Sequence, residues 1–185
     1  MTSLRILATL LLAIATTNSI ASVPSQGAPL PTLEITERGE LTMEGDEFTF
    51  IPWNSDTPRD TVHVIQYFGA TLGDRDVFKP FTDMLEDELA PGTVHVSTVL
   101  NLDAAVWGTT GFVVSELKKN KQQHPTATMV LDADGDGVDT WALGEAGTGL
   151  IIMDKTGTVQ YFSLGSPDEK DLATTLELIK TLSGS

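Results

Sequence analysis

The residues most able to do chemistry form a run of carboxylates and glycines at Asp132–Gly137 (DADGDG). Asp132, Asp134 and Asp136 occupy the first, third and fifth positions of this run, and glycine occupies the sixth. That is the front half of a calcium loop, in which oxygen ligands wrap a hard cation and glycine allows a sharp bend. The twelfth position, where such a loop carries a bidentate glutamate, is Leu143. The run therefore predicts either a weak calcium site on the three aspartates or an ordinary Asp/Gly turn.

The sequence contains no cysteine. This excludes a disulfide framework, a thiolate nucleophile and any cysteine-based metal cluster. His63, His95 and His124 are the only histidines, and their spacing matches neither of the His-x-x-x-His and His-Glu-x-x-His zinc patterns. A zinc site or a Ser-His-Asp triad would need residues brought together from distant parts of the chain. Calcium is thus the one cofactor that the sequence suggests, and enzymatic activity is not indicated.

The length and charge narrow the function classes further. The 185 residues are enough for one domain, and 41% of them are hydrophobic, as in an ordinary α/β protein. Eleven basic and twenty-six acidic side chains give a formal net charge of −15. Such a surface repels phosphate backbones and anionic lipid, so we expect no nucleic-acid partner and a preference for cations or basic partners.

The first 21 residues have the pattern of a secretory signal peptide. Arg5 precedes a short apolar run, Ile6–Ala15, and the small residues Ser19 and Ala21 predict cleavage after Ala21. The run is too short to span a bilayer, and without cysteine no lipid can be attached after cleavage, so we expect no stable membrane anchor. Cleavage removes Arg5 and leaves ten basic and twenty-six acidic side chains, a net charge of −16. The predicted location is the periplasm.

Periodicity and turn residues indicate the elements that follow. Residues 22–32 are Pro/Gly-rich and are expected to form an extended lead-in to a single domain, residues 33–185. Within residues 33–51, alternating apolar residues predict strands of an N-terminal β-rich extension. The expected elements after it are a strand at Thr61–Tyr67, a helix with an early Pro80, a strand at Thr93–Leu100, a helix at Phe112–Gln123, a strand at Thr126–Leu131, a hairpin of Leu150–Met153 and Val159–Phe162, and a helix capped by Ser166.

This order, β-α-β-α-β-β-α, predicts an α/β fold with a mixed central sheet and helices on both faces. It resembles the thioredoxin fold, and the stretch from Leu72 to Pro80 carries the resemblance. Against the thioredoxin pattern Cys-Gly-Pro-Cys, the sequence reads Leu72-Gly73-Asp74-Arg75, so both thiol positions hold residues without sulfur. The place of the cis-proline falls on Gly149. Disulfide exchange and peroxide reduction are therefore excluded chemically.

Over a longer span, from about Leu33 to Leu182, the chain resembles the YtfJ family of exported bacterial proteins with a thioredoxin-like fold. The residues that carry this resemblance are Ile35–Leu41, Trp53-Asn54-Ser55, Asn101 with Asp103, Asp132 with Gly135, Asp139 with Trp141, and Asp154–Gln160. The resemblance implies a periplasmic protein of unsettled activity.

The sequence therefore favours a binding or interaction protein without thiol redox activity, whose partner is an unidentified envelope protein or peptide. The expected contact residues are Leu72, Gly73, Asp74 and Arg75 of the former active-site turn, together with Gly149. The turn either docks peptides through its backbone or is a relic loop without a role. The alternative function is calcium binding through Asp132, Asp134 and Asp136.

Overall fold

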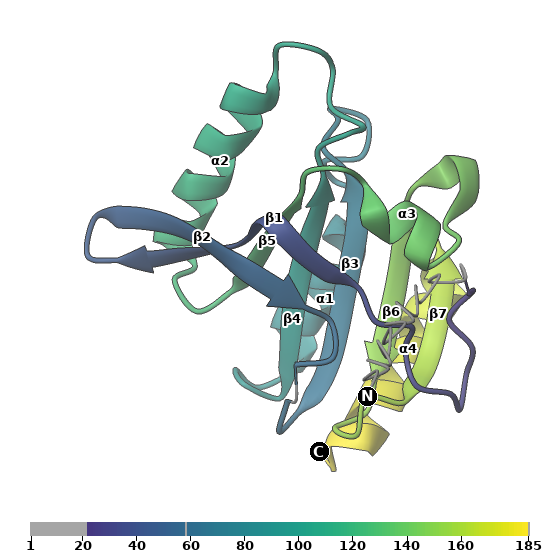
Figure 1. Ribbon diagram of the computed structural model, residues 1–185. Coiled ribbons are helices and arrows are strands. Elements are labelled where there is room, and N and C mark those ends of the chain that lie inside the picture. Colours follow the sequence, from purple (N-terminus) through teal and green to yellow (C-terminus); the bar gives the residue numbers. More distant parts are fainter. Residues whose placement is uncertain (1–21, 58, 185) are drawn as a thin grey trace, which may run out of the picture.

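The computed structural model describes residues 22–57 and 59–184, so the predicted signal peptide lies outside the described residues. This part of the chain forms one seven-stranded sheet with four α-helices (Figure 1). The strands are β1 (Glu34–Glu44), β2 (Glu47–Asn54), β3 (Val62–Gly69), β4 (Val94–Asn101), β5 (Thr128–Asp132), β6 (Gly149–Met153) and β7 (Val159–Leu164). The helices are α1 (Lys79–Glu88), α2 (Thr110–Gln123), α3 (Asp136–Thr140) and α4 (Glu169–Ser183), with a short 3-10 helix η1 (Gly144–Ala146). Within the described residues, no helix is both long enough and apolar enough to cross a bilayer.

The strand order across the sheet is β2-β1-β5-β4-β3-β6-β7. β3, β4 and β5 are parallel, whereas β6, β7, β1 and β2 each run antiparallel to their neighbours. The chain passes from β3 through α1 to β4, and from β4 through α2 to β5, moving one place in the same direction each time. Because such crossovers are right-handed, both helices must lie on the same face of the sheet. The predicted mixed sheet with an N-terminal β-rich extension is confirmed.

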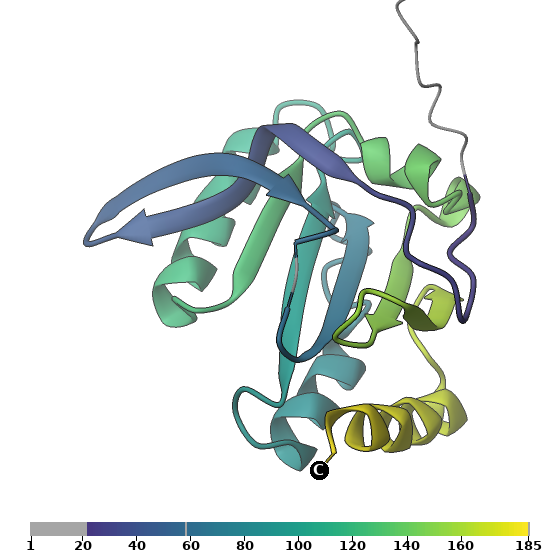
Figure 2. The same cartoon turned by 60° about the horizontal axis from the view of Figure 1, so that its bottom comes forward.

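α1, α2 and α4 cover one face of the sheet, which we call the helical face. α1 and α4 lie side by side on it, as Figure 2 shows. Their apolar side chains meet alternate residues of β3 and β6, and the buried members of this cluster are Val62, Val64, Phe78, Phe81, Leu85, Leu150, Ile152 and Ile179. α2 packs beside them, with Leu117 in a cluster that contains Met129 and Leu131 of β5. Each such side chain contributes about 1.5–3 kcal/mol by leaving water.

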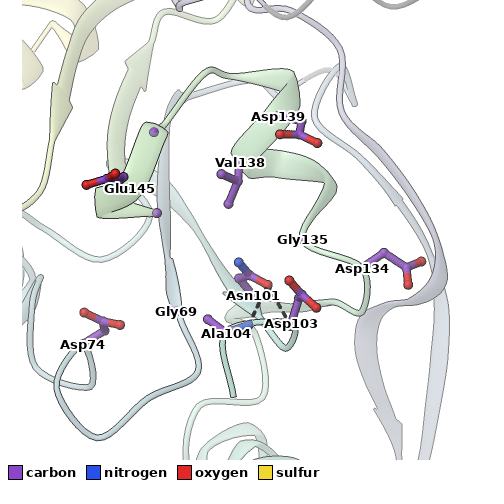
Figure 3. Close-up of a pocket in the computed structure, with 12 residues that line it drawn as sticks. Gly69, Asp74, Asn101, Asp103, Ala104, Asp134, Gly135, Val138, Asp139 and Glu145 are labelled. Atoms are coloured by element: carbon purple, nitrogen blue, oxygen red, sulfur yellow. Dashed lines mark hydrogen bonds between the residues drawn. The ribbon is translucent and has the colours of Figure 1, made fainter. Parts of the chain in front are cut away.

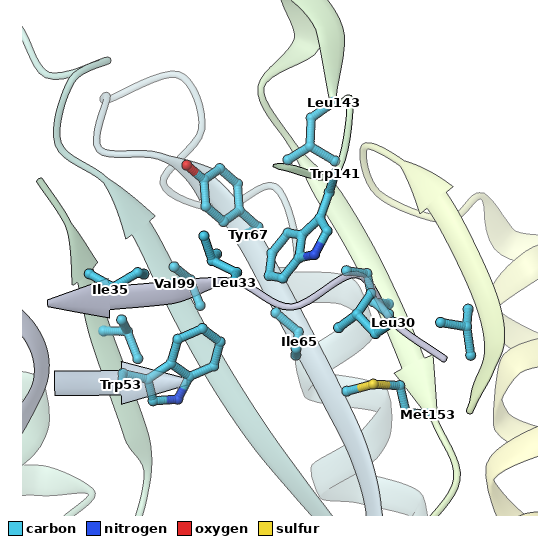
Figure 4. Close-up of a cluster of buried hydrophobic side chains, with 13 residues drawn as sticks. Leu30, Leu33, Ile35, Trp53, Ile65, Tyr67, Val99, Trp141, Leu143 and Met153 are labelled. Carbon is cyan, nitrogen blue, oxygen red and sulfur yellow. The ribbon is translucent and has the colours of Figure 1, made fainter. Parts of the chain in front are cut away.

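The opposite face, which we call the α3 face, is covered by α3, by residues 22–33 and by the end of β2. Two tryptophans, Trp53 of β2 and Trp141 after α3, are buried there (Figure 4). The ring of Tyr67 from β3 packs edge-on against Trp141, with 5.8 Å between ring centroids. Helices therefore lie on both faces as predicted, with α3 alone on this one.

Residues 22–32 pack against the rest of the domain. The Gly27 amide donates to the Val159 carbonyl at 2.8 Å, and the Val159 amide donates to the Ala28 carbonyl at 2.9 Å. Leu30 is buried in the cluster that contains Trp141, whose indole N–H donates to the Pro31 carbonyl at 2.8 Å. The lead-in thus closes part of the core on the α3 face.

β1 changes faces at a bulge. Arg38 and Gly39 both have positive φ, 67° and 75°, and the register with β2 shifts between Ile35 and Glu40. Ile35 packs on the α3 face, whereas Leu41 packs with α2 on the helical face. In a regular strand these two residues, six apart, would point to the same side, so the bulge produces the switch. One hairpin thereby helps to close both faces.

The starts of two helices, α1 and α4, can be compared with the features that the sequence predicted for them. Pro80 lies in the first turn of α1, so it begins the helix and does not bend it. α4 begins at Glu169, and its cap is Asp168, whose carboxylate accepts a hydrogen bond from the Asp171 amide at 2.9 Å. The predicted cap, Ser166, was wrong, because an aspartate two residues later offers an equally good acceptor to the first turn.

Replacement of Gly39 by alanine tests the bulge. A Cβ at Gly39 would overlap the Ile51 carbonyl oxygen, whereas a Cβ at Gly45, which also has positive φ, would meet open space. We expect Gly39→Ala to lower the free energy of unfolding by about 3 kcal/mol, and Gly45→Ala by only about 1 kcal/mol, the cost of a left-handed backbone for alanine. Urea denaturation of both variants measures the difference. Equal losses would mean that close packing at the bulge contributes nothing.

Candidate functional site

A cavity of about 360 Å³ lies where the parallel strands end. Carboxyl ends of parallel strands meet at one edge of a sheet, so the loops after β3, β4 and β5 converge there, as ligand sites of α/β folds do. We call this the acidic cavity, and its lining residues are Gly69, Asp74, Asn101, Asp103, Ala104, Asp134, Gly135, Val138, Asp139, Gly144, Glu145 and Gly147. Figure 3 shows Asp74 and Glu145 at one side of the cavity and Asp134 and Asp139 at the other.

The turn after β3 contributes Asp74. The Ala70 amide donates to the Asn101 carbonyl at 2.9 Å, which fixes this turn beside the end of β4. The Thr71 hydroxyl donates to the Asp74 carboxylate at 2.8 Å and accepts from the Asp74 amide at 3.1 Å, so the carboxylate is held at the cavity. Leu72, Gly73 and Arg75, the other predicted contact residues of the turn, are exposed outside the lining.

The segment before β6 reaches the same cavity through Gly147, which lines it. Gly149, the residue predicted to face the turn, is buried in β6, where it is paired with Tyr67 and lies against the Leu143 side chain. The described residues contain no cis peptide bond, so the chain approaches β6 without the turn that a cis-proline makes in thioredoxins. The structure therefore brings together Asp74 and Gly147, and leaves Gly149 inaccessible beneath them.

All charged side chains that line the acidic cavity are negative. Five carboxylates line it, those of Asp74, Asp103, Asp134, Asp139 and Glu145, and no lysine or arginine of the described residues does. Asn101, at the end of β4, accepts a hydrogen bond from the Asp103 amide at 2.9 Å and so orders the loop that carries that carboxylate. Several like charges around a hollow concentrate a negative potential there. The cavity is suited to a cationic group.

The loop after β4 presents apolar side chains to solvent. Trp107 is 95% exposed and Val106 is 68% exposed, and Leu72 on the neighbouring turn is 84% exposed. A tryptophan so exposed is unusual, because its large ring gains most from burial. Trp107 also lines a shallower hollow that shares Asp103 and Asp134 with the acidic cavity. Sequence reasoning missed Trp107, since a single tryptophan between Val106 and Gly108 carries no periodic signal.

The Asp/Gly run serves a structural purpose that the calcium pattern did not predict. The Asp132 carboxylate is buried and accepts four hydrogen bonds: from the Tyr67 hydroxyl at 2.7 Å and from the amides of Gly135, Asp136 and Gly137 at 3.1, 3.1 and 2.9 Å. Burial of the Tyr67 hydroxyl and the adjoining Asp132 charge raise the pKa of Tyr67, which therefore stays protonated as a donor.

The two glycines of the run are explained in the same way. Gly135 has a φ of 75° at the start of α3, and a Cβ at Gly137 would overlap the ring of Tyr67. Asp134 and Asp136 are exposed, and burial followed by the charges of Asp132, Asp134 and Asp139 raises the pKa of Asp136. In the part of the chain that the structure describes, no three His, Cys, Asp or Glu side chains are arranged to hold a metal ion. Calcium binding on Asp132, Asp134 and Asp136 stays a prediction, and the engagement of Asp132 opposes it.

The histidines do not form a catalytic group with an acid. The His63 ring is hydrogen-bonded to the Ser97 hydroxyl at 2.9 Å, and the His95 ring to the Thr128 hydroxyl at 3.1 Å. The two rings pack edge-on, 5.2 Å apart, on the α3 face near the amino ends of the strands. Burial, then the charges of His95 and Arg59, lowers the pKa of His63 to about 3. Burial and the charge of Arg59 lower the pKa of His95 to about 4. Both rings are therefore neutral near pH 7, and their role is structural.

Comparison with known proteins identifies relatives over most of the chain. The family model described as "Bacterial protein of unknown function (YtfJ_HI0045)" matches residues 25–182. An uncharacterized protein of Haemophilus influenzae is 28% identical over 154 residues, which cover 83% of this chain and 84% of that protein. The uncharacterized protein YtfJ of Escherichia coli K12 is 27% identical over 157 residues, which cover 84% of this chain and 85% of that protein.

Solved structures show the fold. A thiol-disulfide isomerase from Corynebacterium glutamicum has a TM-score of 0.56 at 16% identity, covering 84% of this chain and 97% of that one. A thioredoxin-like protein in its oxidized form has a TM-score of 0.56 at 15% identity, covering 82% of this chain and 94% of that one. The predicted thioredoxin-like fold is confirmed, and at these identities the likeness extends to the fold alone.

The low histidine pKa values predict how stability depends on pH. The unfolded chain binds protons on His63 and His95 near the ordinary pKa of 6.5, whereas the folded protein binds them only near pH 3 and 4. Between these limits the unfolded state holds more protons, so the free energy of unfolding falls on acidification, by up to about 1.4 kcal/mol per pH unit for the buried His63 and by less for the half-buried His95, whose charge solvent screens. His63→Gln, which keeps a partner for Ser97, should give a shallower fall in urea melts between pH 4 and 6.5. An unchanged slope would contradict a buried neutral His63.

Proposed function

Because the chain belongs to the YtfJ_HI0045 family of bacterial proteins of unknown function, we propose its function from the geometry of the site. It is an exported periplasmic binding protein without thiol redox activity, which holds a basic segment of an envelope protein or peptide at the acidic cavity. The observation that carries the proposal is the single cavity that the former active-site turn and the segment before β6 line together, with five carboxylates and no cation.

The chemistry of the cavity supports a basic occupant. A lysine or arginine side chain placed there would meet the carboxylates of Asp74, Asp103 and Asp134, each on a different loop. Attraction between opposite charges on facing surfaces sets partner choice and accelerates association. Nucleic acid and anionic membrane surfaces are disfavoured by the same charge, which is −15 for the whole chain.

The exposed apolar side chains support a protein or peptide over a small cation. Leu72, Val106 and Trp107 stand on the two loops beside the cavity and would cover apolar residues that flank the basic group. Tryptophan is the residue most often found to dominate the energy of a protein interface. A segment that alternates basic and apolar residues fits both features.

Export rests on the sequence pattern of residues 1–21, and the absence of cysteine rests on the sequence itself. Without a thiol the protein cannot form the mixed disulfide through which exchange proceeds. The fold then supplies a surface for binding in the position where related folds carry out redox chemistry.

Two synthetic peptides of equal length test the proposal, one alternating lysine and leucine and the other alternating glutamate and leucine. We expect the lysine peptide to bind in calorimetry, more weakly as salt rises, and the glutamate peptide not to bind. The double variant Asp103→Asn/Asp134→Asn should weaken binding by up to about thirtyfold, since each of the two exposed charges contributes at most about 1 kcal/mol. Trp107→Ala should also weaken binding, with the free energy of unfolding changed by less than about 0.5 kcal/mol.

A matched control removes the same two charges from α1. Glu86 and Asp87 are exposed there and form no ion pair with a described residue. Glu86→Gln/Asp87→Asn should leave binding of the lysine peptide unchanged. Equal weakening in both double variants would mean that net charge alone attracts the peptide, and would overturn the assignment of the cavity.

The alternative function, calcium binding through Asp132, Asp134 and Asp136, has a separate test. Calcium would have to displace the hydrogen bonds that the buried Asp132 carboxylate accepts, because the oxygens that would bind the ion already serve as acceptors. We therefore expect no saturable heat when millimolar calcium is titrated into the protein. Saturable heat that disappears in Asp134→Asn/Asp136→Asn would establish the alternative.

A further inference from the structure

A second cavity, of about 290 Å³, lies at the opposite end of the sheet, between the end of β2, the start of β3 and the β6–β7 turn. We call it the arginine cavity. Its polar lining consists of Thr32, Ser55, Asp56, Thr57, Arg59, His63, Asp154, Lys155 and Thr156, and its apolar lining is formed by Pro29, Leu30 and Met153. Its position, far along the strands from the acidic cavity, makes it independent of the proposed function.

The two carboxylates of the arginine cavity are already engaged. Asp154 accepts hydrogen bonds from the amides of Thr156 and Thr158 at 2.9 and 3.2 Å, and from the Gln160 side chain at 2.7 Å. These bonds, together with one from the Thr156 hydroxyl, hold the pKa of Asp154 below its usual value against the effect of burial. Asp56 accepts a hydrogen bond from the Thr32 hydroxyl. Both carboxylates therefore shape the cavity and need no further partner.

The two cations of the cavity, by contrast, have no carboxylate partner. Arg59 and Lys155 form no ion pair with any described residue, although the protein has more than twice as many acidic as basic side chains. Among the described residues, none accepts a hydrogen bond from the buried Nε–H group of Arg59. Buried donors in folded proteins nearly always have a partner, so an unpaired one points to an acceptor other than these residues.

A second buried donor lies nearby. The indole N–H of Trp53 is also without an acceptor, and Trp53 comes two residues before Ser55 of the lining. His63, which lines the cavity with Arg59, has its Nε2 hydrogen-bonded to the Ser97 hydroxyl. Two unpaired donors thus occur in one region of the α3 face.

We propose that the arginine cavity binds a small carboxylate anion, held by the Arg59 guanidinium and the Lys155 ammonium. The planar guanidinium matches the two oxygens of a carboxylate, and its buried Nε–H gains the acceptor that it lacks. Asp56 and Asp154 line the same cavity, so a singly charged carboxylate is repelled less than a doubly charged phosphate. Leu30, Pro29 and Met153 provide apolar surface for a short hydrocarbon part.

The test is an NMR titration of the ¹⁵N-labelled protein with sodium acetate and sodium butyrate, at constant ionic strength against sodium chloride. The Arg59 Nε–H signal, assigned with Arg59→Gln, should shift saturably, whereas the signals of Arg38 and Arg75 should not move. Butyrate should bind more tightly than acetate because of its apolar chain, and phosphate more weakly than either. A peptide with a free carboxyl terminus, compared with its amidated form, distinguishes a chain end from a free acid as the source of the carboxylate.

Variants make the assignment specific. Lys155 is exposed, so Lys155→Gln should leave the fold intact and weaken butyrate binding by about tenfold, the loss expected for one charge-assisted hydrogen bond. Lys170→Gln, which removes an exposed lysine of α4 that forms no ion pair with a described residue, should leave butyrate binding unchanged. A Lys155→Gln variant that binds as tightly as the parent, or an Arg59 signal that fails to saturate, overturns the proposal. Tighter binding of phosphate than of acetate overturns the assignment to a carboxylate.

Discussion

The Asp132 carboxylate is the interaction on which the arrangement of the structure depends. It lies at the end of a central strand, 1% exposed, and accepts hydrogen bonds from the Tyr67 hydroxyl and from three successive backbone amides at the start of α3. A buried carboxylate is tolerated only when donors replace its water, and here the donors come from two elements, β3 and the start of α3. The same residue's carbonyl accepts from the Leu102 amide at 2.8 Å. The loops after β3, β4 and β5 are thereby held in one arrangement, and the acidic cavity is their common boundary.

Much of the fold could be predicted from the sequence because its signals are local. Continuous apolar runs predicted β3, β4 and β6, a proline indicated the start of α1, and the order of the elements predicted a mixed sheet. Long-range features could not be predicted in this way. The burial of Gly149 depends on Leu143 and on pairing with Tyr67, and the partner of Asp132 is 65 residues away along the chain.

The residues of the candidate site could likewise be predicted only where their signal is local. Asp74 was predicted at the site from its place in a familiar turn, and the structure puts it at a cavity. Glu145 and Asp139 join it only because Asp132 starts α3 where it does, and no spacing in the sequence carries that information. The aspartate pattern itself left a calcium site and an Asp/Gly turn both open, since a carboxylate that accepts from backbone amides and a metal ligand use the same oxygens. A prediction that Asp132 is buried would have favoured the structural role of its carboxylate over the role of a metal ligand.

The bonds between the segment at residues 27–30 and the β6–β7 hairpin have a consequence for the order of folding. They join parts of the chain separated by about 130 positions, from Gly27 to Val159. Contacts of such long sequence separation form late, because the entropy of closing so large a loop must be offset by structure already in place. During synthesis residues 27–31 therefore emerge early and stay unpaired until Trp141, whose indole N–H donates to the Pro31 carbonyl, and then Val159 have been made. The first segment of the domain to be made is the last to find its place, so an incomplete chain leaves its aromatic core open to solvent.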